Sequence, residues 1–252
     1  MTPIEDRTGK MPVLAAGKGW LVVDKPAGMT VHNAPGQDVC SLIFRHIRNE
    51  PFVSERIGMD PDFGVNPVHR LDRETSGILL LAATPERFRF LSKQFQSRQV
   101  IKRYIAILHG ALKHPQGNDS WQTWRWALSK TAGGRFRPEG TGRLQSAVTR
   151  YRILDGSKHY TLVEIDLLSG RKHQIRRHAR LSGHPVAGDV RYGSKRAAAF
   201  LKSRYDFDRL ALHARSLTFQ PPDRTAPETV STPAIPEQLL NLLTSEQANP
   251  HP

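Results

Sequence analysis

The chain is predicted to adopt an α+β fold around a central, largely antiparallel mixed β-sheet flanked by helices and loops. Segments that favour strands outnumber those with a helical period, and the two kinds do not alternate as they do in α/β proteins. Two β-rich segments, 147–154 and 160–168, are separated by Asp155-Gly156-Ser157, which is typical of a hairpin turn. Because a tight hairpin joins antiparallel strands, it favours this kind of sheet.

The N-terminal part is expected to contribute two strands. Residues 1–18 carry no apolar period and are interpreted as a flexible lead-in. Residues 20–23, Trp-Leu-Val-Val, are expected to form a short strand that the turn-forming residues 24–28 end. The continuous apolar run at 77–83 indicates a strand buried on both faces.

Helices are expected before and after that buried strand. Residues 39–47 fit a short helix, whereas 50–67 contains three prolines and two glycines and is expected to be mostly loop. Thr84-Pro85-Glu86 is typical of a helix start, because it offers a hydroxyl cap, a proline at the first position and an acid in the first turn.

The C-terminal half is predicted to contain further strands, one helix and a long connection. Residues 104–108 indicate a strand, and the polar, Gly-rich stretch 113–145 indicates a long connection with some strand. A helical period begins at Ile175 and ends at Gly183, and a last strand lies within 210–219. Residues 223–252 are interpreted as a Pro-rich tail with a short helix around 235–243.

The charge of the chain indicates a polyanionic partner. The net charge is +14, and residues 170–215 hold twelve Lys and Arg against three Asp and Glu. A basic surface kept only for solubility is the alternative, but charge concentrated in one segment favours nucleic acid, because clustered cations release the counterions held on phosphates.

Several classes of protein are disfavoured by composition. The single cysteine, Cys40, allows no internal disulfide and favours a reducing compartment. No apolar run is long enough to span a membrane, and no signal peptide is recognisable, so we expect a cytoplasmic protein without a membrane partner. There is no Walker loop, no G-x-G-x-x-G and no zinc-ligand spacing, so neither a cofactor nor a metal is expected.

The segment 69–77, His-Arg-Leu-Asp-Arg-Glu-Thr-Ser-Gly, is the densest cluster of reactive side chains. It places Asp72 between Arg70 and Arg73 in a loop directly before the buried strand, the usual setting for a functional carboxylate. The alternative is that Asp72 or Thr75 caps a turn and the charges are solvated. No G-x-S-x-G surrounds Ser76, so a hydrolase triad is not indicated.

The segment 170–178 is the second candidate. Its basic side chains fit a phosphate-binding helix start, where backbone N–H groups add to the charge, although an ordinary basic surface helix fits as well. Those side chains are Arg171, Lys172, His173, Arg176 and Arg177.

Taken together, the motifs resemble those of the RluA-type pseudouridine synthases, in the branch without an S4 domain. The matching blocks run in family order over about residues 20–219. They are Trp20-Leu21-Val22-Val23-Asp24-Lys25-Pro26-Ala27-Gly28, His69-Arg70-Leu71-Asp72-x-x-Thr75-Ser76-Gly77, Lys102-Arg103-Tyr104, Gly170-Arg171-x-His173-Gln174-Ile175-Arg176-x-His178, Gly188-Asp189-x-x-Tyr192-Gly193 and Leu212-His213-Ala214.

The resemblance implies the pseudouridine synthase fold, with a catalytic domain at 19–222, and an isomerisation in which the bond from a uridine base to its sugar is cleaved and remade through carbon. Asp72 is implied as the catalytic carboxylate, Arg176 as the arginine that pairs with it, and Tyr104 as the aromatic group on the target base. Asp72 could attack the sugar or the base or remove a sugar proton, and the residues do not choose among these routes.

The implied partner is structured RNA, with ribosomal RNA slightly favoured over transfer RNA, and a monomer is the default expectation. The target base must be flipped out, and Arg70 is implied to fill the vacated space while Arg73, Arg171, Lys172, His173 and Arg177 hold flanking phosphates. A catalytically silent RNA-binding or RNA-folding module with the same fold is the alternative. A glycoside hydrolase is disfavoured, because it normally needs two carboxylates and only Glu74 lies near Asp72.

Overall fold

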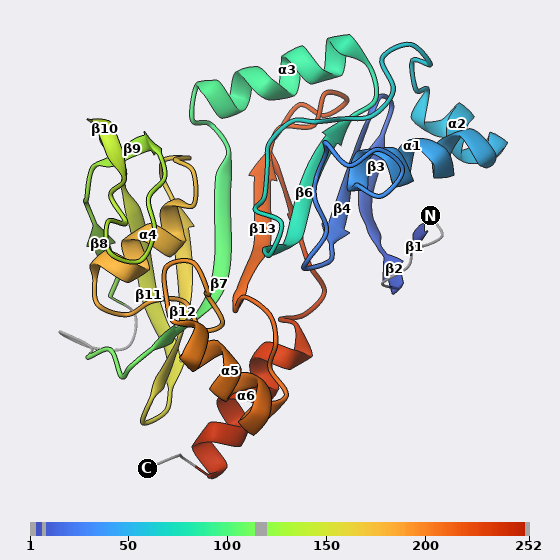
Figure 1. Cartoon of the computed structure of the whole chain (residues 1–252). Helices are drawn as coiled ribbons and strands as arrows, with labels where there is room; N and C mark the ends of the chain where they lie inside the picture. The colour runs from blue at the N-terminus through green and yellow to red at the C-terminus, as the bar shows by residue number, and fades with distance from the viewer. Residues whose placement is uncertain (1–3, 7–8, 114–119, 250–252) are drawn as a thin grey trace. The chain divides into compact units, whose positions relative to one another are not determined.

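The structure, a computed structural model, describes the backbone of residues 4–6, 9–113 and 120–249 and the side chains of residues 11–113 and 120–249 (Figure 1). Its strands are β1 (Ile4–Asp6), β2 (Gly9–Met11), β3 (Val13–Gly17), β4 (Trp20–Lys25), β5 (Asn66–Pro67), β6 (Ser76–Ala82), β7 (Ile101–His109), β8 (Gln122–Trp124), β9 (Leu128–Thr131), β10 (Thr141–Gln145), β11 (Thr149–Gly156), β12 (Tyr160–Leu167), β13 (Leu212–Phe219) and β14 (Glu228–Ser231). Its helices are α1 (Val39–Asn49), α2 (Pro51–Ile57), α3 (Pro85–Gln96), α4 (Gln174–Leu181), α5 (Lys195–Tyr205) and α6 (Glu237–Ala248). The chain divides into two compact units, Met1–Ile101 with Ala214–Pro233 and Lys102–His213 with Ala234–Pro252.

The first unit is organised by β4 and β6, which lie side by side in Figure 1. β4 pairs antiparallel with β3 on one side and β6 on the other, so that Val22 lies opposite Leu80. Every residue of β6 is buried. Alternate residues of these strands share an apolar cluster with α3 and β13, which is the kind of core that fixes a strand and the loop leading into it. The cluster contains Trp20, Val22, Ile78, Leu80, Leu91, Val100, Leu217 and Phe219.

The second unit contains the antiparallel strands β7-β12-β11-β8 in that order. β9 and β10 form a separate antiparallel hairpin. Helix α4 packs against β11, and α6 packs against β12. These pairings confirm the predicted α+β class with largely antiparallel strands.

The predicted helix starts are confirmed where capping residues and a first-position proline mark them. Helix α3 starts after Thr84, whose side chain accepts a hydrogen bond from Arg87 N, with Pro85 at the first position. Helix α1 is capped in the same way by Asp38. The predicted hairpin between β11 and β12 is present, but Asp155 and Gly156 pair with β12 as the end of β11, so the connection lies at residues 157–159 rather than 155–157.

The structure corrects two N-terminal interpretations. Residues 13–17 of the expected lead-in form β3, because their edge pairing with β4 supplies the hydrogen bonds that the sequence pattern does not reveal. The expected loop 50–67 contains α2, since Pro51 occupies the first helical position, where it breaks no hydrogen bond, and Gly58 ends the helix in a left-handed conformation.

The C-terminal part also holds more structure than expected. Helix α5 was not predicted, because Leu201 is its only buried residue and no apolar period marks it. In the expected tail, β14 pairs with β13, and α6 extends to Ala248 with Leu239, Leu242 and Leu243 buried. None of the helices in the described part of the chain has the length and apolarity that crossing a membrane requires.

Candidate active site

Asp72 is half-buried and lies in the loop that leads into β6. Its carbonyl oxygen accepts a hydrogen bond from the Thr75 backbone N–H at 3.1 Å, which closes a turn before the strand. Because β6 is buried at every position, the carboxylate is attached to a rigid element on its C-terminal side.

Gly77 allows the start of β6 to approach β13 closely. Its φ is +109°, and a Cβ at this position would lie 2.2 Å from the carbonyl oxygen of Ala214. Both the backbone angle and the space therefore require glycine here, five residues after Asp72.

Lys25 fastens the other side of the Asp72 loop. Its side chain is fully buried, and Nζ donates to the carbonyl oxygens of Pro26 and Met29 at 2.8 Å and of Arg73 at 3.1 Å. Arg73 and Gly28 are further joined by two hydrogen bonds of 2.9 Å, one between their backbones and one from Arg73 Nε. The turn after β4 is thereby tied to the residue next to Asp72, a role that the sequence did not reveal.

Replacing Lys25 with Met should destabilise the first unit and lower activity. The Pro26 and Met29 carbonyls would lose the ammonium, and a buried polar group without its partner costs about 1–3 kcal/mol. We expect the free energy of unfolding in urea to fall by about 2 kcal/mol or more. The exposed Lys18, changed to Met, is the matched control. Equal stability and activity of the two variants would contradict this role.

The other polar residues of the loop divide into interior and surface groups. His69 Nε2 accepts a hydrogen bond from Leu80 N at 3.0 Å, and its ring stacks on Phe95 with centroids 4.9 Å apart, so His69 supports β6. Arg70 and Arg73 are exposed. Their predicted contact with RNA stays a prediction.

Tyr104 and Arg176 belong to the second unit. Tyr104 lies on β7, opposite Ile165 of β12, and is 7% exposed. Its predicted role on the target base is untested by this geometry, and so is the predicted pairing of Arg176 with Asp72.

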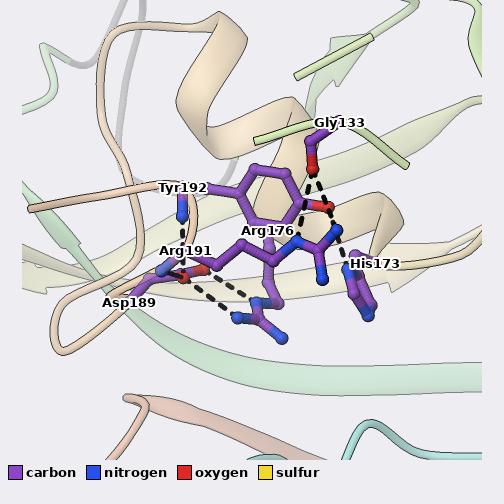
Figure 2. A network of polar contacts seen from close by, with 6 residues as sticks. All are labelled: Gly133, His173, Arg176, Asp189, Arg191 and Tyr192. Carbon is purple, nitrogen blue, oxygen red and sulfur yellow. Dashed lines mark hydrogen bonds and ion pairs between the residues drawn. The ribbon is translucent and has the colours of Figure 1, made fainter. Parts of the chain in front are cut away.

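Arg176 is held by a buried carboxylate, as Figure 2 shows. Nε and Nη2 donate to the two carboxylate oxygens of Asp189 at 2.7 and 3.0 Å, and the side chains are 4% and 0% exposed. The guanidinium carbon lies 5.4 Å from the centre of the Tyr192 ring. A bidentate pair of this kind fixes both the position and the plane of the guanidinium.

Asp189 also organises the turn that follows it. Oδ1 accepts hydrogen bonds from the backbone N–H groups of Arg191 and Tyr192 at 2.9 and 3.0 Å. The Tyr192 hydroxyl lies 2.8 Å from His173 Nδ1, and burial raises the pKa of this phenol. Asp189 and Tyr192 stand in a motif that the sequence matched to the family, but no role had been assigned to either.

The prediction that Arg177 contacts RNA phosphates is replaced by a structural role. Its side chain is 0% exposed. The guanidinium donates to the carbonyl oxygens of Ser129 and Lys172 at 3.0 and 3.1 Å and also to those of Pro138 and Glu139. A fully buried guanidinium whose N–H groups are used by backbone carbonyls has no surface for a phosphate.

Gln174 and His178 complete the interior face of α4. Gln174 Nε2 donates to Thr149 Oγ1 at 2.9 Å, and this hydroxyl lies 3.0 Å from His178 Nδ1. His178 Nε2 lies 2.9 Å from the Trp126 carbonyl, which can only accept, so Nε2 carries the proton and Nδ1 accepts from Thr149. Neutral His178 therefore satisfies every hydrogen bond of this chain of contacts.

This histidine should make stability depend on pH. Burial lowers the pKa of His178 from 6.5 to about 4, with a partial opposing effect of the Trp126 carbonyl. The unfolded chain therefore binds a proton first, and the contribution of neutral His178 to stability is complete above pH 6.5 and is lost as the pH falls toward 4. The loss approaches about 3 kcal/mol. Urea unfolding across this range should show a shallower pH dependence in His178→Gln, and an unchanged slope would contradict the assignment.

The remaining basic residues of 170–178 lie nearer the surface. Lys172 is exposed, whereas Arg171 and His173 are half-buried. Arg171 N donates to Gln174 Oε1 at 3.0 Å, so this helix start satisfies part of its backbone internally. For these three residues RNA contact stays a prediction.

The features so far define a class, namely a basic α+β protein whose candidate reactive group is one loop carboxylate and whose second unit contains a buried arginine fixed by a carboxylate. A family model described as RNA pseudouridylate synthase matches residues 19–181. The chain belongs to this family.

Curated relatives agree with this assignment. The chain is 32% identical over 229 residues to an uncharacterized RNA pseudouridine synthase, YlyB, of Bacillus subtilis, with 91% of this chain and 70% of that protein covered. It is 34% identical over 228 residues to ribosomal large subunit pseudouridine synthase D of Xylella fastidiosa (88% and 65% covered). It is 33% identical over 222 residues to tRNA pseudouridine synthase C of Haemophilus ducreyi (84% and 86% covered).

Two solved human structures share the fold. They are described as RNA Pseudouridylate Synthase Domain Containing 1 and 4, with TM-scores of 0.69 and 0.68. The comparisons cover 93% and 92% of this chain and 86% and 91% of the human chains, at 23% identity in both cases. At this identity the likeness supports the fold alone.

Proposed function

We propose that the protein is an RNA pseudouridine synthase that isomerises a uridine in structured RNA, with Asp72 as the catalytic carboxylate. The observation that carries this proposal is the placement of Asp72, half-buried in a loop that Lys25 ties down on one side and the buried strand β6 on the other. Product and substrate contain the same atoms, so one positioned carboxylate can start the reaction without any net oxidation or reduction.

Tyr104 and Arg176 are assigned the supporting catalytic roles that the family resemblance implies. The burial of Tyr104 and the bidentate fixing of Arg176 by Asp189 support these roles, because a catalytic group must be held in one geometry. Exposed Arg70 is assigned to the space that the flipped base vacates.

We place ribosomal RNA ahead of transfer RNA as the substrate. Synthase D of Xylella fastidiosa and synthase C of Vibrio vulnificus are named for the large ribosomal subunit, whereas synthase C of Haemophilus ducreyi is named for tRNA. We further propose that the protein acts in the cytoplasm, where such RNAs are made. We propose that it acts there as a monomer.

The test is a map of pseudouridines in total RNA by carbodiimide-blocked reverse transcription. Cells that lack the protein should lose at least one site, and the gene for the wild-type chain should restore it. The position of that site identifies the RNA. If no site changes in ribosomal or transfer RNA, the enzymatic proposal for these substrates fails and the silent RNA-binding module becomes the better reading.

A further inference from the structure

The β9–β10 hairpin and its flanks form a basic surface in the second unit. Residues 125–145 contain five Arg and Lys and one acidic residue, Glu139. All five basic side chains are exposed. They are Arg125, Lys130, Arg135, Arg137 and Arg143. None of the motif blocks that carry the family resemblance lies in this hairpin.

Phe136 is the most exposed large apolar residue in the described part of the chain, at 93%. It lies between Arg135 and Arg137 in the turn of the hairpin, and the Arg135 guanidinium carbon lies 5.7 Å from its ring centre. A phenyl ring in this position contributes almost nothing to the folded core, because it buries almost no apolar area.

The backbone that presents Phe136 is fastened by three arginines from outside the hairpin. Arg177 donates to Ser129, Pro138 and Glu139, and Arg180 Nε donates to the carbonyl oxygen of Arg135 at 3.1 Å. Arg191 donates to the carbonyl oxygens of Ala132 at 3.1 Å and of Gly133 at 3.1 and 3.2 Å, and Figure 2 shows the Gly133 contact beside the Asp189 turn. The hairpin is thereby held on the same turn that fixes Arg176.

We propose that Phe136 stacks on an unpaired base of the RNA substrate while Arg135 and Arg137 contact the phosphates on either side. This inference rests on the proposed function for its ligand. Every nucleobase offers a flat face to an aromatic ring, and an arginine directly before and after the aromatic residue in the chain suits the phosphate repeat of a single strand. Five exposed cations against one acid favour RNA over a protein partner.

Exposure of a single aromatic residue is common on protein surfaces, so a comparison within the chain is needed. Phe52 in α2 is 75% exposed, but its neighbours in sequence are Pro51 and Val53 rather than arginines. It lies in the first unit and outside the basic hairpin. Phe52 therefore serves as a matched control that differs in its electrostatic setting.

The experiment measures RNA affinity by fluorescence anisotropy with two fluorescein-labelled probes of equal length, a stem with an unpaired uridine loop and a fully paired duplex. Phe136→Ala should weaken binding of the looped RNA by roughly 5- to 100-fold, the size expected for one lost base–aromatic stack. Its affinity for the duplex should stay within about twofold of wild type, because a paired base offers no free face. Phe136→Trp should restore loop binding, and Phe52→Ala should change neither affinity.

The arginines should behave differently from the ring. Arg135→Gln combined with Arg137→Gln should weaken both probes and reduce the slope of log Kd against log salt by about 1 to 2, because two phosphate contacts are lost. If Phe136→Ala binds the looped RNA as wild type does, or loses affinity for both probes equally, the stacking proposal is overturned.

The anisotropy result can be distinguished from the test of the proposed function. Anisotropy measures binding and needs no turnover. A selective loss in Phe136→Ala together with an unchanged pseudouridine map would keep the RNA site and reject the enzyme, whereas a changed map with unaltered Phe136→Ala binding would reject the site alone.

Discussion

Replacing Asp72 with Asn should abolish pseudouridine formation while RNA affinity changes less than tenfold. The amide is close in size to the carboxylate but carries no charge, so it can neither attack the sugar or base nor remove a sugar proton. The loop should keep its shape, because its described fastenings use the backbone of Thr75, the carbonyl of Arg73 and the Lys25 ammonium. Digestion of the RNA to nucleosides and chromatography measures the product directly.

Glu74→Gln is the matched control for this variant. Glu74 is an exposed carboxylate in the same loop. A synthase that uses only Asp72 should keep its activity in Glu74→Gln, whereas a glycoside hydrolase that needs two carboxylates should lose it. Full pseudouridine formation by Asp72→Asn would sink the proposed mechanism.

Replacing Asp189 with Asn should lower the free energy of unfolding by about 3–5 kcal/mol, the usual cost of leaving one charge of a buried pair without its partner. Asn Oδ1 could still accept from the backbone N–H groups of Arg191 and Tyr192. Its NH₂ group, however, would face Arg176 Nε–H, donor against donor, and the guanidinium would lose the Asp189 charge. Urea unfolding measures the difference.

Asp208→Asn is the matched control, because it breaks an ion pair of the same length that is exposed rather than buried. Lys202 Nζ and Asp208 Oδ2 are 2.7 Å apart, the same distance as Arg176 Nε and Asp189 Oδ2, but their side chains are 57% and 52% exposed. An exposed pair contributes little to stability, because water and salt screen it, so Asp208→Asn should unfold close to wild type. Similar losses in the two variants would show that Asp189 is no more important than a surface carboxylate.

The elements that the sequence predicted are those whose signals are local. The start of α3 at Thr84 and Pro85 and the buried strand β6 need only their own residues to be recognised. Strand β3 depends on pairing with β4, and α5 buries only Leu201, so neither leaves a periodic pattern. Pro51 indicates a loop when the sequence is considered alone, although the first position of a helix accepts it.

The residues of the candidate site likewise divide into those that the sequence reveals and those that only the structure reveals. The segment around Asp72 was recognisable because acid, arginines and hydroxyls stand together before an apolar run. Arg176 and Arg177 look equivalent in the sequence, but one pairs with Asp189 and the other with backbone carbonyls of the β9–β10 region. Lys25 could have been found from its position at the end of an apolar strand. A lysine there can be buried only if its ammonium group has several hydrogen-bond acceptors.

The sequence by itself determined the α+β class, the family and a candidate carboxylate, because apolar runs, turn residues and clustered motifs act through neighbouring residues. Only the tertiary structure decided which charged side chains are interior. The sequence does not distinguish the buried side chains of Lys25, Arg176 and Arg177 from the lysines and arginines of the surface. They are buried because the fold brings to each of them at least one carbonyl or carboxylate acceptor from another segment, and a charge can leave water only where such partners replace it.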